Sequence, residues 1–262
     1  MRMPLRETEA IVLRTYRLGE ADKIAALFTR QLGRLRAVAT GAQRTKGRYG
    51  GLLEPLSYLR IWIFERENRD LLRLNSAELL ESFFEMQKDY RVQVAAQYVS
   101  EVTERMVPER EVNDRVFRLL LAVLRGVKRS SEVNRPLLYF NYWMLRLGGV
   151  LPDLGRCASC GRALGAEGGF YGPGAEGLWC AECRSSGGPY PSAGGLRGGT
   201  GLTVTRAALA SAEQVCQGPL DTWLAEQKAP AGVRQARLFF EEMIESHLER
   251  KLVTRGLLEE EM

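Results

Sequence analysis

Four of the five cysteines in this chain form two pairs, and these pairs constrain its fold more than any other feature. Cys157 and Cys160 are separated by two residues, as are Cys180 and Cys183, and nineteen residues lie between the pairs. This spacing is typical of a site in which four thiolates surround one tetrahedral Zn²⁺. Because four thiolates leave no coordination position for water or substrate, the pattern predicts one structural zinc ion and no zinc catalysis.

The remaining composition is that of an ordinary globular protein, long enough for two or three compact units, with 45% hydrophobic and 26% charged residues. No apolar run approaches the ~18 residues that span a bilayer, and the first thirty residues lack the apolar segment of a signal peptide. We therefore expect a cytoplasmic protein with no membrane partner. Thiols stay reduced in that compartment, which favours a metal over disulfides. The fifth cysteine, Cys216, is expected to be a small buried side chain.

The net charge of +5 is concentrated in the N-terminal third of the chain. Residues 1–80 contain fifteen Lys or Arg and nine Asp or Glu, whereas residues 81–262 contain twenty-two and twenty-three. Charge that served solubility alone would be spread evenly. The asymmetry indicates an anion-binding module joined to a nearly neutral body.

The hydrophobic pattern changes its period near residue 83. Before it, five strand candidates are separated by Gly-containing turns and one longer loop at 41–51, which predicts a small closed barrel; they are 9–15, 23–29, 34–40, 56–64 and 71–74. After it, apolar residues recur at helical spacing in 88–106, 112–129, 137–147, 203–227 and 232–252. We expect an α+β protein with a barrel domain at 1–80 and a helical domain at 81–262, into which the cysteine segment 150–200 is inserted.

The basic domain contains a loop suited to phosphates. Arg44, Lys46 and Arg48 alternate along it, Tyr49 follows, and no acid occurs between residues 23 and 53. Cationic side chains bind a nucleic-acid backbone, and an adjacent aromatic ring can stack on a base. We therefore predict that this loop binds nucleic acid and that Tyr49 stacks.

Further candidates lie on the predicted strands. Alternation places Arg34 and Arg36 on one face of their strand, and it places Arg60, Trp62, Phe64 and Arg66 on one face of another. Two interpretations of Trp62 and Phe64 stay open: they stack on bases, or they pack against the helical domain. The nucleic-acid-binding residues predicted in this domain are Arg14, Lys23, Arg34, Arg36, Arg44, Lys46, Arg48, Tyr49, Arg60, Trp62 and Arg66.

A second basic feature lies on the predicted helix at 112–129. Helical periodicity gathers four arginines opposite its apolar face; they are Arg115, Arg118, Arg125 and Arg129. This ridge either extends a DNA path or is an ordinary solvated face, which is the simpler interpretation.

No catalytic pattern is evident in the sequence. His247 is the only histidine, and its H-x-E motif follows both cysteine pairs, whereas zinc deaminases have it before them. The glycine-rich segment 194–201 is not followed by Gly-Lys-Ser/Thr, so nucleotide binding is unsupported. Residues 150–190 contain three arginines and four acids. This charge balance favours a structural role for the segment over phosphate binding. We expect a protein that is not an enzyme and has no small-molecule substrate.

These features together resemble the bacterial RecO family of DNA repair proteins along nearly the whole chain. The segments that carry the resemblance are 9–14, 19–23, 28–29 and 39–42 in the basic domain and 157–161 and 177–180 around the cysteines. The order of barrel, helices, inserted cysteine pairs and closing helix also agrees. Glu176 stands where a second glycine is often found in the family, which affects a turn and not a ligand.

The resemblance implies an OB-fold that binds single- and double-stranded DNA and anneals complementary strands, in a nucleoid-associated protein. It also implies a partner, RecR, with which the protein helps to place RecA on strands coated by single-strand-binding protein. Without the resemblance, the residue patterns predict only a basic barrel that binds nucleic acid, joined to a body that a zinc ion stabilises. An RNA-binding accessory factor remains an alternative, since OB-folds bind RNA equally well.

Overall fold

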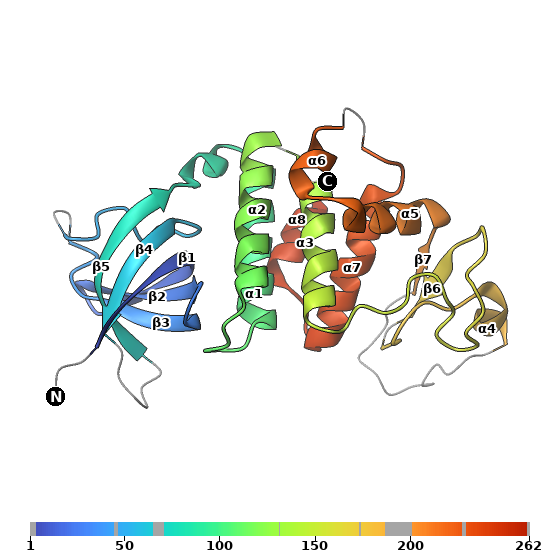
Figure 1. Cartoon of the computed structure of the whole chain (residues 1–262), viewed down its shortest axis with the longest axis horizontal. Coiled ribbons are helices and arrows are strands. Elements are labelled where there is room, and N and C mark those ends of the chain that lie inside the picture. Colours follow the sequence, from blue (N-terminus) through green and yellow to red (C-terminus); the bar gives the residue numbers. More distant parts are fainter. Residues whose placement is uncertain are drawn as a thin grey trace. The chain divides into compact units, whose positions relative to one another are not determined.

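The computed structural model describes residues 4–44, 47–64, 71–130, 132–172, 174–186, 201–226 and 229–260. The chain divides into two compact units, one formed by residues 1–131 with 252–262 and the other by residues 132–251. Figure 1 shows the order of the elements along the chain. No helix within the described ranges is long and apolar enough to cross a membrane.

The first unit begins with the five-stranded closed barrel that the sequence predicts. Its strands are β1 (Leu5–Leu18), β2 (Asp22–Thr29), β3 (Gly33–Ala39), β4 (Tyr58–Phe64) and β5 (Leu71–Glu81), closed in the order β1-β2-β3-β5-β4. All neighbours pair antiparallel except β3 and β5, which run parallel. β1 is much longer than predicted because it pairs with β4 through its first half and with β2 through its second, and a register shift between Val12 and Arg14 lies where the two pairings meet.

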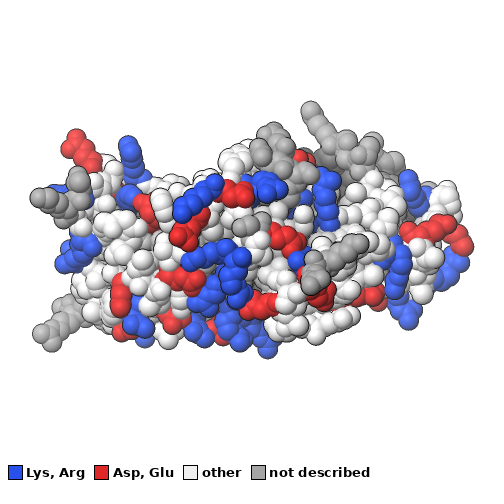
Figure 2. All heavy atoms as spheres, turned by 90° about the horizontal axis from the view of Figure 1, so that it is seen from above, with Lys and Arg blue, Asp and Glu red and all other residues white. Residues whose placement is uncertain are grey.

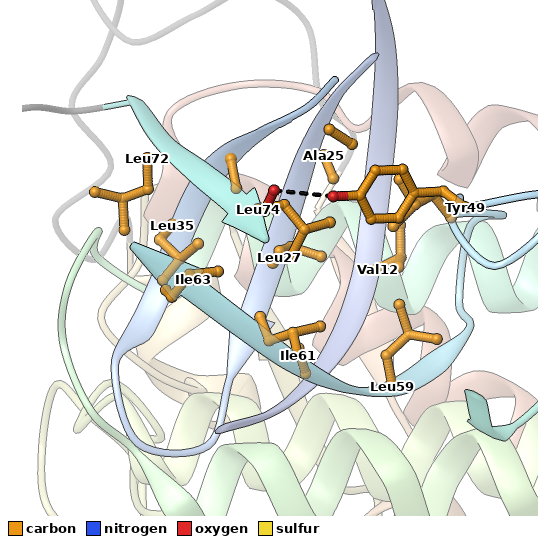
Figure 3. Packing of buried hydrophobic residues seen from close by; sticks show 14 residues of the cluster. Val12, Ala25, Leu27, Leu35, Tyr49, Leu59, Ile61, Ile63, Leu72 and Leu74 are labelled. Carbon is orange, nitrogen blue, oxygen red and sulfur yellow. Dashed lines mark hydrogen bonds between the residues drawn. The ribbon is translucent and has the colours of Figure 1, made fainter. Parts of the chain in front are cut away.

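Side chains that alternate along the strands fill the barrel (Figure 3). In β4, for example, Leu59, Ile61 and Ile63 are buried and point inward. The core contains mostly aliphatic residues from all five strands, with contributions from the loop after β3; its members are Ala10, Val12, Ala25, Leu27, Leu35, Ala37, Ala39, Tyr49, Leu53, Leu59, Ile61, Ile63, Leu72 and Leu74. Burial of these side chains drives closure of the barrel, at about 1.5–3 kcal/mol for each large one.

Two helices of the same unit cover part of the outside of the barrel, α1 (Tyr90–Met106) and α2 (Asp114–Ser130), preceded by a 3₁₀ turn, η1 (Phe84–Lys88). A third helix, α8 (Val253–Glu260), packs on α1. α1 ends before Pro108, and Asn113 caps α2 by accepting a hydrogen bond of 3.1 Å from the backbone N–H of Val116. Phe117 packs against Phe28 and Tyr58 on the outer face of the barrel.

The second unit is built around two packed helices, α3 (Asn134–Leu147) and α7 (Val233–Leu248). Between them the chain forms β6 (Gly169–Tyr171), α4 (Ala181–Ser185), β7 (Leu202–Val204), α5 (Arg206–Gln214), η2 (Val215–Gln217) and α6 (Leu220–Leu224). Arg237 and Glu241 form a fully buried ion pair of 2.6 Å on α7. The cysteine segment is thus inserted between helices, as predicted.

Three helix predictions need correction. The helix predicted at 203–227 is interrupted after α5 and η2, because Gly218 is extended and Pro219, which lacks an N–H, starts a new helix. The helix predicted at 232–252 ends at Leu248, where Glu249 adopts a left-handed φ of 52°, and α8 follows it as a separate helix. α3 starts at Asn134, so that Pro136 lies inside the first turn, where its missing N–H has no helical partner to lose.

Candidate metal centre and nucleic-acid interface

The cysteine pairs lie on two short turns that face each other. In the first, the Gly161 N–H donates to the carbonyl of Cys157 at 2.9 Å, and Gly161 adopts a φ of 73° that glycine tolerates without strain. In the second, Cys180 occupies the position before the first residue of α4, and Cys183 lies inside that helix. The backbone N–H of Cys180 donates to the sulfur of Cys157 at 3.3 Å, which joins the two turns directly.

The sulfur atoms are placed as a tetrahedral metal requires. All four lie within 4.8 Å of one another, and the Sγ atoms of Cys160 and Cys180 are 3.9 Å apart. Sulfur ligands at about 2.3 Å from a tetrahedral ion are roughly 3.8 Å from each other. A disulfide would need a separation of about 2.05 Å. The four cysteines therefore fit a metal ion, as their spacing predicts.

The electrostatics of the cluster also favour a cation. A hydrogen bond from Arg162 lowers the pKa of Cys160 to about 6. Ser159 by itself would lower the pKa of Cys183, but Cys160 and Cys180 outweigh it and raise that pKa to about 12. These hydrogen bonds favour the thiol form of Cys183 beside its neighbours. A divalent ion would instead bind all four groups as thiolates.

The loop between β3 and β4 requires one correction. Arg44 and Arg48 are exposed, as predicted. The prediction that Tyr49 stacks on a base is wrong, because this side chain is only 2% exposed and belongs to the barrel core. Its hydroxyl donates to the carbonyl of Leu74 at 2.9 Å (Figure 3). Lys46 lies outside the described residues.

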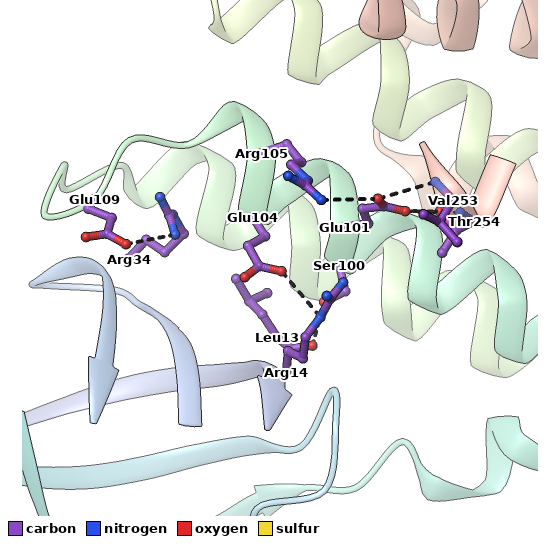
Figure 4. Close-up of polar contacts among 10 residues, drawn as sticks. All are labelled: Leu13, Arg14, Arg34, Ser100, Glu101, Glu104, Arg105, Glu109, Val253 and Thr254. Atoms are coloured by element: carbon purple, nitrogen blue, oxygen red, sulfur yellow. Dashed lines mark hydrogen bonds and ion pairs between the residues drawn. The ribbon is translucent and has the colours of Figure 1, made fainter. Parts of the chain in front are cut away.

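Several predicted DNA contacts on the strands are engaged in ion pairs. Figure 2 shows basic and acidic side chains intermixed on the visible face. Arg34 is mostly buried, donates to the Val107 carbonyl at 2.9 Å and pairs with Glu109 (Figure 4), so its role is to anchor β3 to the segment after α1. Its assignment to a DNA contact stays a prediction, at a cation that these contacts already engage.

The other strand cations keep more of their surface. Arg36 also pairs with Glu109, Arg14 with Glu104, Lys23 with Glu54, and Arg60 with both Glu7 and Glu78, at distances of 3.4–3.8 Å. Exposed pairs of this length are weak, and a phosphate can compete for these cations. They remain predicted contacts. Arg66 lies outside the described residues.

Trp62 and Phe64 both lie on the outer face of the barrel and are half-buried. The indole N–H of Trp62 donates to the carboxylate of Glu7 at 3.1 Å. In the pairing register Glu7 and Ser76 flank Trp62, whereas Leu5 and Arg73 flank Phe64. The carboxylate beside Trp62 repels phosphate, and the cation beside Phe64 attracts it.

The arginine ridge on α2 is divided between two roles. Arg125 pairs with Glu81 at 2.8 Å and so fastens the helix to the end of β5. Arg118 pairs with Asp114 one turn away at 3.0 Å. Arg115 and Arg129 are exposed. The exposed part of the ridge stays a secondary prediction for DNA binding.

Sequence reasoning missed two cations of the barrel. Arg17 and Arg73 are exposed, and neither forms an ion pair with a residue that the structure describes. Arg73 pairs in register with Val38 and Phe64, so alternation within its strand would have placed it on the outer face.

Cys216 and His247 lie outside these surfaces. Cys216 is exposed and not buried as expected, with its sulfur 2.6 Å from the hydroxyl of Tyr142. Cys216 lies in the short 3₁₀ turn η2, in which Val215 is the buried residue. His247 is exposed near the end of α7.

The fold and the site define a two-unit protein in which a small barrel with exposed cations accompanies a helical body holding a cysteine cluster suited to a metal. The family model described as Recombination protein O N terminal matches residues 1–83, and the model described as Recombination protein O C terminal matches residues 87–256. The chain therefore belongs to the RecO family of DNA repair proteins.

Two curated relatives match the chain over nearly its full length, and a third matches it over about two thirds or more. The chain is 39% identical over 255 residues to the DNA repair protein RecO of Koribacter versatilis, which covers 97% of this chain and 98% of the relative. It is 31% identical over 250 residues to the DNA repair protein RecO of Anaeromyxobacter sp. (strain K), covering 95% and 94%. The RecO of Nocardioides sp. is 38% identical over 191 residues, covering 70% and 76%.

Proposed function

We propose that this chain is a DNA-binding mediator of recombinational repair that binds single- and double-stranded DNA and promotes annealing of complementary strands. With RecR as partner, it helps to place RecA on strands coated by single-strand-binding protein. Membership of the RecO family supports this proposal, and the observation that carries it is the group of exposed cations on the barrel and its loop. DNA as its ligand places the protein at the nucleoid in the cytoplasm.

Annealing needs no covalent chemistry, and we propose no catalytic residue. Two complementary strands repel each other through their phosphates. Arg44 and Arg48 on the loop, with Lys23 and Arg36 on the strands, lower this repulsion when they bind the backbones. The base edges stay free to pair, because cations that bind phosphates do not contact the bases.

The metal in this proposal is one structural Zn²⁺ held by Cys157, Cys160, Cys180 and Cys183. The ion would supply folding free energy to a segment with little regular secondary structure, on the order of 10 kcal/mol in small zinc peptides. The cluster leaves no position for a substrate, so the chemistry of the protein does not pass through it.

The experiment that tests the function is strand annealing. Two complementary DNA strands, each coated with single-strand-binding protein, are mixed with the protein in the presence and absence of RecR. We expect annealing to be faster with the protein. Competition between single-stranded DNA and RNA of equal length separates this function from RNA binding; preference for RNA would overturn the proposal.

Salt dependence tests the loop. Each phosphate neutralised on a single strand contributes about −0.7 to the slope of log affinity against log salt. Replacing Arg44, Lys46 and Arg48 together by Gln should therefore reduce the slope by up to about 2. The matched control replaces Arg206, Arg234 and Arg250 by Gln, three exposed cations of the second unit. Equal slopes for the two triple variants would rule out the loop as a DNA contact.

A further inference from the structure

The two cysteine turns are joined by an ion pair outside the cluster of sulfur atoms. Arg162 belongs to the first turn, where its carbonyl accepts a hydrogen bond of 2.8 Å from the backbone N–H of Cys157. Glu182 lies between the two cysteines of the second turn. The guanidinium of Arg162 donates to the carboxylate of Glu182 and also to the sulfur of Cys160. One side chain thus contacts a metal ligand of one turn and an acid of the other.

The position of this ion pair is more informative than its strength. The side chains of Arg162 and Glu182 are 60% and 70% exposed, and exposed pairs contribute little to stability because water screens both charges. Of the four clustered cysteines, however, Cys160 is the exposed one, whereas Cys157 on the same turn is only 2% exposed. Arg162 therefore contacts the cluster at the sulfur that is most open to solvent.

A guanidinium at this sulfur affects a four-thiolate site in two ways. Four thiolates around one divalent ion leave a net negative charge, which a neighbouring cation offsets. A hydrogen bond to a ligand atom also fixes the orientation of that ligand, and loss of such a bond typically lowers metal affinity about 10–100-fold. The planar fork of arginine can donate to two acceptors at once, so Glu182 can hold the guanidinium while it contacts Cys160.

Resting on the proposed zinc site, we propose that Arg162 is a positioning residue that retains the metal at its exposed ligand. Its guanidinium orients the sulfur of Cys160 and offsets the negative charge of the four thiolates, and Glu182 keeps the guanidinium at that sulfur. Arg162 does not bind the metal itself, because a guanidinium stays protonated and has no acceptor atom. Without Arg162, loss of the metal should begin at Cys160.

The test measures how tightly the full-length protein holds zinc. Arg162→Gln is compared with the matched control Arg184→Gln. Arg184 is also exposed and directly follows Cys183, but its guanidinium lies over the ring of Phe170, 4.1 Å from the centroid. Both variants remove one positive charge from the cysteine segment. In competition with a chromophoric chelator, Arg162→Gln should lose zinc affinity about tenfold or more and the control less than about twofold.

A second readout separates positioning from a general loss of stability. Co²⁺ in a thiolate site absorbs light by charge transfer from sulfur to metal, and a hydrogen bond lowers the energy of the sulfur electrons. The band should therefore move to longer wavelength in Arg162→Gln and stay in place in the control. Arg162→Lys keeps the charge but donates from a single nitrogen, so its zinc affinity should lie between those of wild type and Arg162→Gln.

A double-mutant cycle tests the role of Glu182. Glu182→Ala removes an acid near four thiolates, which by charge alone would favour a bound cation. Because the substitution also releases the guanidinium, we expect zinc affinity to fall about threefold instead. In the Arg162→Gln background the same substitution should cause no loss, since no guanidinium remains to be held.

If wild type binds neither zinc nor cobalt, the proposed zinc site fails, and the inference fails with it. If wild type binds zinc and Arg162→Gln binds it as tightly as Arg184→Gln does, the zinc site stands and the inference is wrong. Equal losses in these two variants with an unshifted cobalt band would also overturn the inference, because the net charge of the segment would then matter and the contact with Cys160 would not.

Discussion

Single residues decide which cations and rings of the barrel are free to bind. Tyr49 and Phe64 are both aromatic residues next to basic ones, and only burial separates their roles. Tyr49 lies inside the barrel, while Phe64 lies outside it beside Arg73. The sequence of the loop suggests stacking by Tyr49 because a loop has no periodicity from which an inward direction can be derived. Strand positions do have one, so alternation alone places Trp62 and Phe64 correctly on the outer face.

Tyr49→Phe tests the role of Tyr49 in the core. The variant loses the hydrogen bond to the Leu74 carbonyl while it keeps the ring, so the free energy of unfolding should fall by about 1 kcal/mol. DNA affinity should not change. Urea denaturation measures the first quantity and oligo(dT) binding the second. Tyr90→Phe, at an exposed tyrosine, is the control and should change neither. Weaker DNA binding by Tyr49→Phe at unchanged stability would contradict the burial of this side chain.

At the scale of elements, the connection from α7 to α8 departs furthest from the sequence prediction. α8 returns to α1, where the carboxylate of Glu101 accepts hydrogen bonds from the backbone N–H of Thr254 at 3.1 Å and from its hydroxyl at 2.8 Å (Figure 4). Glu101 is 2% exposed and caps a helix about 150 residues away in the chain. Sequence rules for helix starts consider only capping residues that are adjacent in the chain. They cannot predict this cap, because the capping carboxylate comes from another helix.

Glu101→Ala should therefore destabilise the first unit. Two backbone N–H groups at the start of α8 and the nearby Arg105 lose their partner, which should lower the free energy of unfolding by about 2–3 kcal/mol. Glu104→Ala removes an acid from the same helix, and its partner Arg14 is exposed and 3.5 Å away, so a loss below about 1 kcal/mol is expected. Chemical denaturation of both variants makes the comparison. Equal losses would mean that Glu101 does not hold α8 in place.

The chain forms two compact units. The sequence predicts the helices and strands better than it predicts which of them belong to the same unit. The charge asymmetry, the barrel and the cysteine cluster follow from local patterns, namely composition, alternation and spacing. The grouping of α8 with the N-terminal residues does not, since it depends on contacts between distant segments. Local patterns also do not predict the ion pairs of Arg34 and Arg125. Their acidic partners, Glu109 and Glu81, lie on other segments of the chain.

Loss of the metal should affect the two units differently. The cysteine cluster lies in the second unit, whereas the predicted DNA contacts lie in the first. Replacing Cys157 and Cys180 by Ser removes one cysteine from each turn, so the proposed zinc ion should be lost and the second unit should unfold at a lower temperature. DNA affinity should fall only in proportion to the fraction of protein that unfolds.

Elemental analysis, thermal unfolding and oligo(dT) binding measure these three effects on the same preparation. Cys216→Ser is the control, since this cysteine lies outside the cluster and serine can keep a hydrogen bond to Tyr142; it should retain the metal and the stability of wild type. Chelation of the metal from wild type should reproduce the double variant. If the double variant stayed folded but no longer bound DNA, the cysteine segment itself would contact the nucleic acid. Loss of affinity without loss of folding requires that the changed residues belong to a direct contact.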